Sequence, residues 1–333
     1  MKAAQLIKYQ KNAQLKINEV PIPQITANEV LIKVKVAAVN PLENLITGGN
    51  IKLIQNYQLP ETMGNELTGI IENVGKDVRD FNIGDKIYTR LPLNKIGAFA
   101  EYVAVNHDAI ALLPKNLNFA TGAAAPLTGL TAYQGLHEEL HADPGKTVFI
   151  PGGSGSFGQM AVPIAKDLGL KVIVSGNVRS RDQIMNIGAD QFLDYKTENY
   201  WEILHDVDYV IDTLGASEIE RELSIIKKGG RLLSLKAGPN KQFAIDRQFP
   251  AWKKFLFTFA GRKFDKMASL AGTTYRFIFV RSDGQQLQKI TKIIEKNNII
   301  PAIDQTKFHL SDINKAINYM STGHPKGKVL IYF

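Results

Sequence analysis

The chain has 333 residues, of which 44% are hydrophobic and 22% are charged, values that are ordinary for a globular protein. This length suggests about two domains. The lack of cysteine excludes disulfides, thiolate metal ligands and a cysteine nucleophile, and it agrees with a reducing compartment. The sequence shows neither a signal-peptide core at its start nor a run of roughly 18 apolar residues. We therefore expect a cytoplasmic protein that has no membrane partner.

Basic residues outnumber acidic ones by 8, and the sequence pI is near 9.3. Because the lysines and arginines are scattered along the chain, nucleic acid is not the favoured partner. The densest basic stretch, residues 252–264, also carries aromatic residues, a combination that suits a membrane surface or a protein partner. Our interpretation is an amphipathic helix that packs over a pocket or a subunit contact and keeps its charges in water.

Up to about residue 115 the sequence alternates between short apolar runs and turn residues, a pattern typical of β-strands. The clearest predicted strands span Val30–Val39, Gly69–Val74, Lys86–Thr89 and Phe99–Val105. We expect a β-rich domain over residues 1–117.

From residue 118 the pattern changes to alternating strands and helices, which is typical of a parallel sheet. Strands are predicted at 147–150, 171–175, 191–193, 207–211, 231–235 and 275–280. Helices are predicted from about 156 and at 181–187, 199–205 and 216–226. The expected fold class is therefore α/β, with a doubly wound, parallel, six-stranded sheet over residues 118–282. Residues 283–333 are expected to complete the β-rich domain.

A glycine motif follows the first strand of this predicted sheet. Gly153, Gly155 and Gly158 form G-x-G-x-x-G between the strand at 147–150 and the next helix. In this order the diphosphate of a dinucleotide approaches bare backbone and lies at the N-terminus of the helix. The string alone is a weak signal in a chain with 27 glycines, and its position between strand and helix gives it weight. The other loop residues expected to contact the cofactor are Ser154, Ser156 and Phe157.

The end of the second strand selects between NADH and NADPH, because an Asp or Glu there binds the ribose hydroxyls in NAD-dependent enzymes. Here Arg179 and Arg181 follow the strand, and no carboxylate occurs before Asp182. Arginine holds a 2′-phosphate bidentately, so the sequence predicts NADPH. The alternative is that both arginines are solvated charges at a helix start, where cations oppose the helix dipole. Also expected at the cofactor are Ser175 and Asn177.

A possible metal motif lies just before the glycine loop. Residues His137 to His141 read H-E-x-x-H, which places two histidines on one helical face in zinc proteases. The segment stops at Asp143-Pro144-Gly145 and offers no obvious third ligand. We interpret it as a solvated helix end and predict no metal site.

Several short motifs occur in a defined order along the chain. They are AAVNP at 37–41, GNELTG at 64–69, FNIGDKI at 81–87, GAFAEY at 97–102, PLTGLTAY at 126–133, GAD at 188–190 and GKV at 327–329. With these motifs the chain resembles the medium-chain dehydrogenase/reductase superfamily over nearly its whole length, in particular the zinc-free, quinone oxidoreductase-like branch. The resemblance implies a GroES-like catalytic domain and a Rossmann domain.

The resemblance also carries a departure that bears on the substrate. Zinc-bearing alcohol dehydrogenases of this superfamily have a cysteine where this chain has Asn40 and a histidine where it has Asn65. Neither amide is a good zinc ligand. Without a Lewis acid an alcohol is hard to oxidise, so an electron-poor acceptor is favoured. The family then implies transfer of hydride from NADPH to a quinone or to an α,β-unsaturated carbonyl compound.

The resemblance implies roles for further residues. Asn40 matches an asparagine expected to donate to the substrate oxygen, and Tyr57 is a second candidate for that role; alternatively both fill a loop wall. Thr128 matches a position beside the nicotinamide, although an N-cap role explains it equally well. Tyr195 follows the third strand, where it can line the adenosine phosphate pocket. The remaining expected cofactor contacts are Thr213, Leu214, Gly215, Ser234, Lys236 and Lys328.

Two other functions stay open at this point. A nucleotide-dependent binding or sensor protein with RNA affinity has the same fold and charge, and an NADP-dependent alcohol dehydrogenase has the same order of domains. A homodimer is expected from symmetry base rates and from the resemblance.

Overall fold

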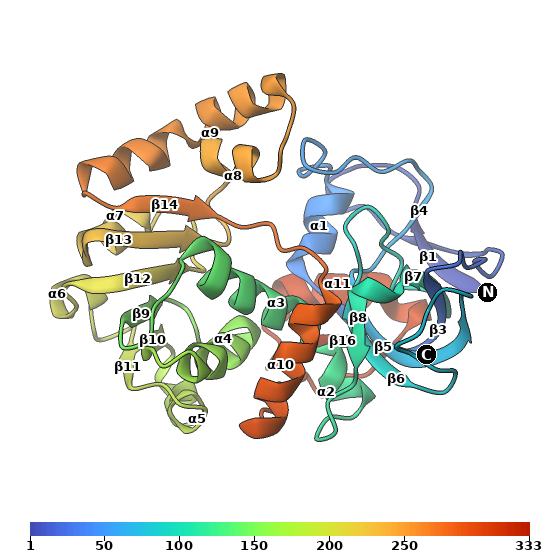
Figure 1. Ribbon diagram of the computed structural model, residues 1–333. Coiled ribbons are helices and arrows are strands. Elements are labelled where there is room, and N and C mark those ends of the chain that lie inside the picture. The colour runs from blue at the N-terminus through green and yellow to red at the C-terminus, as the bar shows by residue number, and fades with distance from the viewer. The chain divides into compact units, whose positions relative to one another are not determined.

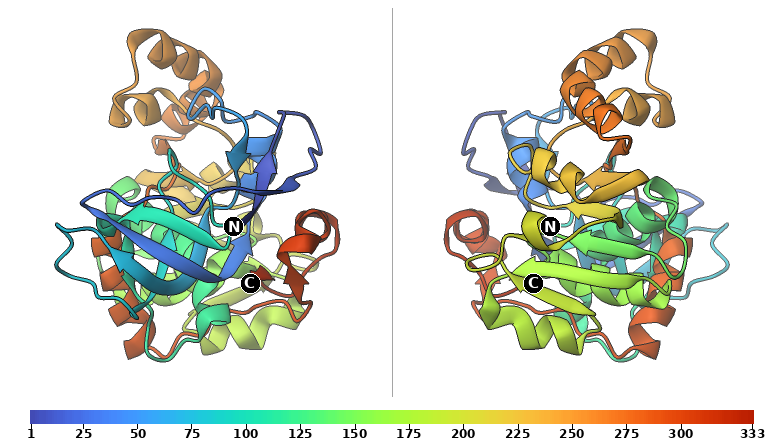
Figure 2. Two further views of the ribbon diagram at one scale, coloured as in Figure 1. Left: turned by 90° about the vertical axis from the view of Figure 1, so that its right-hand side faces the viewer. Right: turned by 90° about the vertical axis from the view of Figure 1, so that its left-hand side faces the viewer.

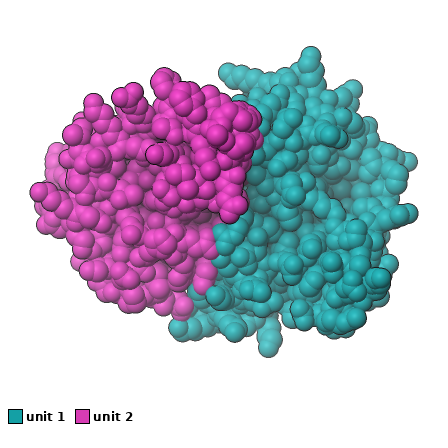
Figure 3. Space-filling view, turned by 45° about the horizontal axis from the view of Figure 1, so that its top comes forward, with its two compact units in different colours: residues 1–130, 281–333 teal, residues 131–280 magenta.

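The structure, a computed structural model, describes residues 1–333. It divides into two compact units, one formed by residues 1–130 and 281–333 and the other by residues 131–280 (Figure 3). The boundaries proposed from the sequence fall at 117/118 and 282/283. The chain thus leaves the first unit once and returns to it after the second unit is complete.

The first unit, residues 1–130 and 281–333, is built on two β-sheets (Figure 1). The smaller has the order β2-β1-β4, from β1 (Lys2–Leu6), β2 (Lys16–Glu19) and β4 (Glu61–Thr62). The larger has the order β15-β16-β3-β5-β6-β8, with β7 also paired to β3. Its strands are β3 (Glu29–Val39), β5 (Glu66–Val74), β6 (Lys86–Arg90), β7 (Tyr102–Asn106), β8 (Ile110–Leu112), β15 (Phe308–His309) and β16 (Val329–Tyr332).

The long strand β3 joins the two ends of the chain in this unit. Its first half pairs with β7 and its second half pairs antiparallel with β16, where Val39 lies opposite Val329. Because β16 comes from the C-terminal segment, that segment completes the sheet. The helices of the unit are α1 (Pro41–Thr47), α2 (Phe119–Ala123), the first part of α3 (Pro126–Gln134), α10 (Gly284–Lys296) and α11 (Ile313–Thr322).

The second unit, residues 131–280, holds a six-stranded parallel sheet in the order β11-β10-β9-β12-β13-β14 (Figures 1 and 2). This order and the parallel pairing confirm the predicted doubly wound α/β class. The strands are β9 (Thr147–Ile150), β10 (Lys171–Gly176), β11 (Gln191–Asp194), β12 (Val207–Asp212), β13 (Ile226–Ser234) and β14 (Thr274–Phe277). Every residue of β12 is buried, as expected of a central strand covered on both faces.

Helices connect these strands, and Figure 2 shows them flanking the sheet. They are α4 (Ser156–Asp167), α5 (Arg181–Asn186), α6 (Tyr200–Ile203), α7 (Ile219–Ser224), α8 (Lys241–Asp246) and α9 (Ala251–Leu270). Helix α4 continues through Pro163 and is buried from Gly158 to Ala165. No helix in the structure is both long enough and apolar enough to span a bilayer.

Candidate active site

The glycine loop lies between β9 and α4, as the sequence predicts. A Cβ on Gly158 would lie 1.7 Å from the carbonyl oxygen of Gly153, so only glycine lets the helix approach the strand this closely. A Cβ on Gly153 would lie 2.8 Å from the side chain of Ile150. At Gly155, by contrast, a Cβ would meet nothing within 4 Å. Two glycines therefore serve packing, and Gly155 leaves open space beside the backbone.

The first turn of α4 offers backbone donors to that open space. Gly155 is the N-cap residue, and no side chain caps this end of the helix. The N–H groups of the first turn have no partner inside a helix, and here they belong to Ser156, Phe157 and Gly158. Free N–H groups and the positive end of the helix dipole together favour an anion such as a diphosphate.

The end of β10 and the turn that follows it lie next to the glycine loop. Ser175 is buried, and its hydroxyl accepts a hydrogen bond from the N–H of Gly152 (3.3 Å). Asn177 accepts from the N–H of Arg179 (3.1 Å) and thereby holds the turn that presents this arginine. The arginine is exposed. It is therefore available to an anion next to the glycine loop.

Arg181 differs from Arg179 in its surroundings. Its guanidinium donates to the carbonyl of Phe192 (3.2 Å) and lies 4.0 Å from the carboxylate of Glu198. These contacts use part of the hydrogen-bonding capacity of the Arg181 guanidinium. Of the two arginines predicted to bind a 2′-phosphate, Arg179 thus has the less engaged side chain.

A buried aspartate organises the loops that follow β12 and β13. Asp212 is fully buried, and its Oδ1 accepts from the N–H groups of Leu214 and Gly215, both at 2.7 Å. Its Oδ2 accepts from the hydroxyl of Ser234 (2.6 Å), and that hydroxyl accepts in turn from the backbone of Lys236 (3.2 Å). Thr213 donates to the carbonyl of Pro151 (2.7 Å). The predicted residues of both loops are thus brought together by one carboxylate that sequence reasoning missed.

A second buried acid lies close to Asp212. Both carboxyl oxygens of Glu222 are buried without a hydrogen-bond partner. Burial, and then the neighbouring charges of Asp212 and Glu218, raises the pKa of Glu222 to about 10. Glu222 is therefore protonated at neutral pH.

The first unit holds a buried polar cluster, which we define as Asn40, Glu43, Asn65, Glu66 and Lys328. All five side chains are at least nine-tenths buried. Glu66 Oε1 accepts from the Asn40 amide (2.9 Å) and pairs with the Lys328 ammonium (2.6 Å). Its Oε2 accepts from the N–H of Leu127 at the start of α3 (2.8 Å). A carboxylate with three donors, one of them cationic, is well compensated for its burial.

The other half of the buried polar cluster has no cation. Glu43 Oε2 accepts from the backbone N–H of Asn40 (2.6 Å), and its Oε1 accepts from the Asn65 amide (2.8 Å). Burial raises the pKa of Glu43 to about 7, and the charge of Glu66 acts in the same direction. The Oδ1 of Asn65 is buried without a partner. Glu43 can therefore gain or lose a proton near neutral pH.

The buried polar cluster does not fit a zinc ion. The Asn40 amide donates to Glu66, and its oxygen accepts from Lys328 (2.5 Å), so both of its polar atoms are engaged. The positive charge in the cluster is the ammonium of Lys328. Lys328, expected at the cofactor, is placed here by the structure, and Asn40, expected to donate to substrate, has a 1% exposed side chain.

Three further predicted residues have defined surroundings. Tyr57 is buried, and its hydroxyl donates to the carbonyl of Leu93 (2.7 Å); burial raises its pKa. Thr128 is the third residue of α3 rather than its cap, and its hydroxyl donates to the carbonyl of Ala124 (3.1 Å). Tyr195 is exposed. The hydroxyl groups of Tyr57 and Thr128 are thus both hydrogen-bonded to backbone carbonyls.

The H-E-x-x-H segment lacks the helical geometry that metal binding requires. A π-helical turn covers Gly135–Glu139 and ends before His141, whose φ is +43°. The two histidines therefore do not share a helical face. Contrary to the expectation of a solvated end, Glu139 is largely buried and forms an ion pair with Arg276 (2.6 Å).

Two family models match separate parts of the chain. The model for the alcohol dehydrogenase GroES-like domain matches residues 26–115, and a model described as zinc-binding dehydrogenase matches residues 187–331. The second match contains neither Asn40 nor Asn65. The name of that model therefore does not bear on the positions where zinc-bearing members hold their ligands.

Named relatives of the chain include alkenal/one and quinone oxidoreductases. The NADPH-dependent alkenal/one oxidoreductase of Arabidopsis thaliana is 28% identical over 95% of this chain and 75% of its own length. The quinone oxidoreductase of Mus musculus is 32% identical over 64% of this chain and 66% of its own length. The structure of the quinone oxidoreductase from Coxiella burnetii has a TM-score of 0.82 at 26% identity and covers 100% of this chain and 99% of its own. The chain therefore belongs to the zinc-free, quinone oxidoreductase-like branch of the medium-chain dehydrogenase/reductase superfamily.

Proposed function

We propose that this oxidoreductase uses NADPH to reduce a quinone or an alkene conjugated to a carbonyl group. The observation that carries the proposal is the glycine loop with its uncapped helix α4 beside Arg179. The backbone N–H groups of residues 156–158 and an exposed guanidinium together match a dinucleotide that carries a 2′-phosphate. The names of the relatives support the same cofactor and substrate classes.

The chain holds the cofactor loops in place before any ligand binds. Asp212 fixes Leu214, Gly215 and Ser234 through three hydrogen bonds, so these loops lose little freedom on binding. Asn177 and Ser175 hold the turns on the other side of the glycine loop. When bound, the reduced nicotinamide supplies a hydride. We assign the diphosphate to the backbone of residues 154–158 and the 2′-phosphate to Arg179.

The buried polar cluster supports an electron-poor acceptor. Addition of hydride to a quinone or to the β carbon of an enone places negative charge on oxygen, and a fixed N–H donor stabilises that charge by a hydrogen bond. We assign this role to the Lys328 ammonium, whose charge is paired with Glu66 and whose position is also held by Asn40. Glu43 exchanges its proton near neutral pH and is assigned to the supply of the proton that the reduced product takes up. Alcohol oxidation fits less well, since the cluster does not fit zinc.

The test follows NADPH consumption with a panel of quinones, enones and alkenals. Arg179→Ala should raise the KM for NADPH by about tenfold, with little change in kcat or in the KM for NADH. Arg181→Ala, whose guanidinium is already bonded to Phe192, should have a smaller effect and serves as the matched control. An unchanged KM for NADPH in Arg179→Ala would remove the assignment of the 2′-phosphate.

We also propose a homodimer in solution, from symmetry base rates. Light scattering on the purified protein tests this proposal. A mass of one chain at assay concentration contradicts it.

A further inference from the structure

Helix α9 is amphipathic, and its apolar outer side is exposed. Trp252, Phe255, Leu256 and Phe259 follow the spacing i, i+3, i+4, i+7, which places them on one face of a helix. We call these four residues the aromatic face. Phe255 and Phe259 are 72% and 74% exposed, and Trp252 is 56% exposed. The sequence indicates a helix that packs over a pocket or a subunit contact, and all four side chains of the aromatic face are exposed.

The opposite side of α9 is already buried. Phe257 contacts the ring of Phe243, with ring centroids 5.8 Å apart, and Phe264 stacks on Tyr275 (5.1 Å). A Cβ on Gly261 would lie 2.4 Å from the Cα of Asn240, so glycine is needed for this close approach. The packing of α9 on the rest of its unit therefore does not depend on the aromatic face.

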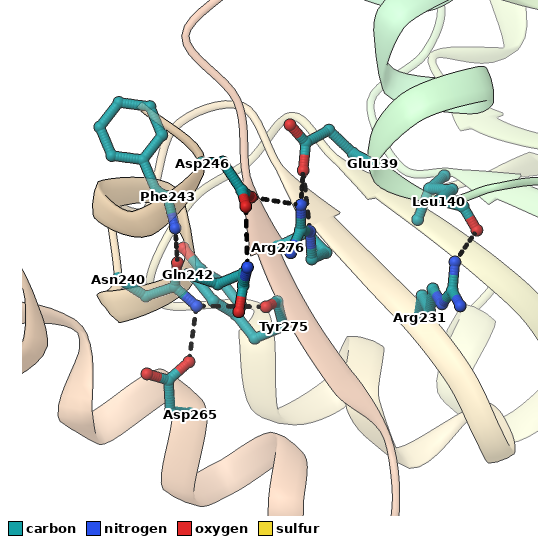
Figure 4. A network of polar contacts seen from close by, with 10 residues as sticks. All are labelled: Glu139, Leu140, Arg231, Asn240, Gln242, Phe243, Asp246, Asp265, Tyr275 and Arg276. Carbon is teal, nitrogen blue, oxygen red and sulfur yellow. Dashed lines mark hydrogen bonds and ion pairs between the residues drawn. The ribbon is translucent and has the colours of Figure 1, made fainter. Parts of the chain in front are cut away.

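A polar network fixes the helix pair α8 and α9 beside edge strand β14 (Figures 1 and 4). The Asn240 amide donates to the Asp265 carboxylate of α9 (2.7 Å) and to the carbonyl of Tyr275 in β14 (3.2 Å). Arg276 of β14 pairs with Asp246 of α8 (2.7 Å) and with Glu139. The network thus fixes the position of helix α9, which carries the aromatic face. The Asp265 carboxylate is hydrogen-bonded within this network.

The exposed side of α9 is strongly cationic. Arg262, Lys263 and Lys266 are exposed and continue the line of the aromatic face toward the C-terminal end of the helix. The helix carries five basic residues and one acidic residue, Asp265. The outer side therefore combines exposed aromatic rings with cations that have no neighbouring carboxylate on the same side.

We propose that helix α9 binds the surface of an anionic phospholipid bilayer. The aromatic face enters the headgroup region, and Arg262, Lys263 and Lys266 contact lipid phosphates. Aromatic rings with adjacent cations are typical of helices that lie in a membrane interface. A second copy of α9 could cover the aromatic rings but would bring no free carboxylate to the exposed cations, because Asp265 is already bound by Asn240, whereas lipid phosphates supply the counter-charge. This proposal reverses the expectation from the sequence that the chain has no membrane partner.

The experiment uses the full chain in a Trp201→Phe background, so that Trp252 is the remaining tryptophan. Vesicles of phosphatidylcholine alone and of phosphatidylcholine with phosphatidylglycerol are added. The proposal expects co-sedimentation and a blue shift of Trp252 emission with the anionic vesicles only. Added salt should weaken the binding, because ions screen the lipid charge.

Two pairs of variants separate the rings from the charges. Phe255→Ser with Phe259→Ser should reduce vesicle binding by at least roughly tenfold, whereas Ile22→Ser with Ile83→Ser, exposed elsewhere, should not. Lys263→Glu with Lys266→Glu should abolish the preference for anionic vesicles, whereas Lys8→Glu with Lys11→Glu should leave it. Thermal unfolding and NADPH oxidation of each variant in solution check that it is folded.

Three results would overturn the proposal. One is an absence of binding to anionic vesicles. Another is equal binding by the aromatic double variant and its control. The third is a blue shift that depends on protein concentration without vesicles and accompanies a doubled mass, because a second copy then covers the aromatic face.

Discussion

Replacing Glu222 by glutamine should stabilise the protein, and the gain should grow with pH. Both oxygens of this carboxyl are buried without partners, and burial together with the charge of Asp212 raises its pKa to about 10. The ordinary value, which applies to the unfolded chain, is 4.5. Between these values the folded state must bind a proton that the unfolded state releases. Glutamine keeps the size and the neutral charge of the protonated acid without taking up a proton.

The magnitude follows from the linkage between proton binding and stability. A group with a raised pKa contributes stability that is complete below its unfolded pKa and is lost as pH rises toward its folded pKa. The loss is about 1.4 kcal/mol for each pH unit in that window. Between pH 5.5 and 7.5 the stability gap between Glu222→Gln and the wild type should therefore widen by about 2.7 kcal/mol. For a unit of this size that corresponds to roughly 5 to 10 °C in Tm.

The assay is thermal unfolding of both proteins at a series of pH values, with cofactor absent. Glu220→Gln is the matched control, because Glu220 lies on the same helix and is exposed. Its Tm difference from the wild type should not change with pH. A gap between Glu222→Gln and the wild type that is constant over pH 5.5 to 7.5 would refute the reasoning, since a shape effect alone does not depend on pH.

Two further predictions concern the glycine loop and the buried polar cluster. Gly158→Ala should lower stability by several kcal/mol and abolish cofactor binding, because its Cβ would overlap the carbonyl of Gly153. Gly155→Ala should instead fold with wild-type Tm and bind NADPH more weakly, and equal Tm values for the two variants would contradict this. Relative to the wild type, Glu43→Gln should gain about 3 kcal/mol of stability in total as pH rises from 4.5 to about 7. The gap should stay constant at higher pH, because the pKa of Glu43 is about 7. The kcat/KM of this variant should also lose any inflection near pH 7, and an unaltered pH profile would remove Glu43 from proton supply.

The sequence predicts best those features that depend on local chemistry. The glycine loop is recognised because each of its steric demands falls within a few residues, as the overlap between Gly158 and Gly153 shows. The six strands of the parallel sheet are recognised because their apolar runs are continuous and alternate with helices. NADPH is predicted from Arg179, which the structure leaves exposed after β10.

Features that depend on distant parts of the chain could not be predicted in the same way. Lys328 contacts Asn40, which lies 288 residues away in the sequence, and no local sequence pattern predicts such a pair. Asp212 acts through backbone N–H groups of its own loop, and an aspartate at the end of a strand was the available signal. The spacing in α9 predicts an amphipathic helix, but only the fold shows which side packs on Phe243 and which side is exposed.

The central claim is tested most directly by titrating the purified protein with NADPH and, separately, with NADH, and by then adding a quinone or an enone to the NADPH complex. The account predicts saturable binding that is tighter for NADPH, loss of that preference in Arg179→Ala, and oxidation of the bound NADPH when the acceptor is added. Failure of the wild type to bind either nucleotide would contradict it.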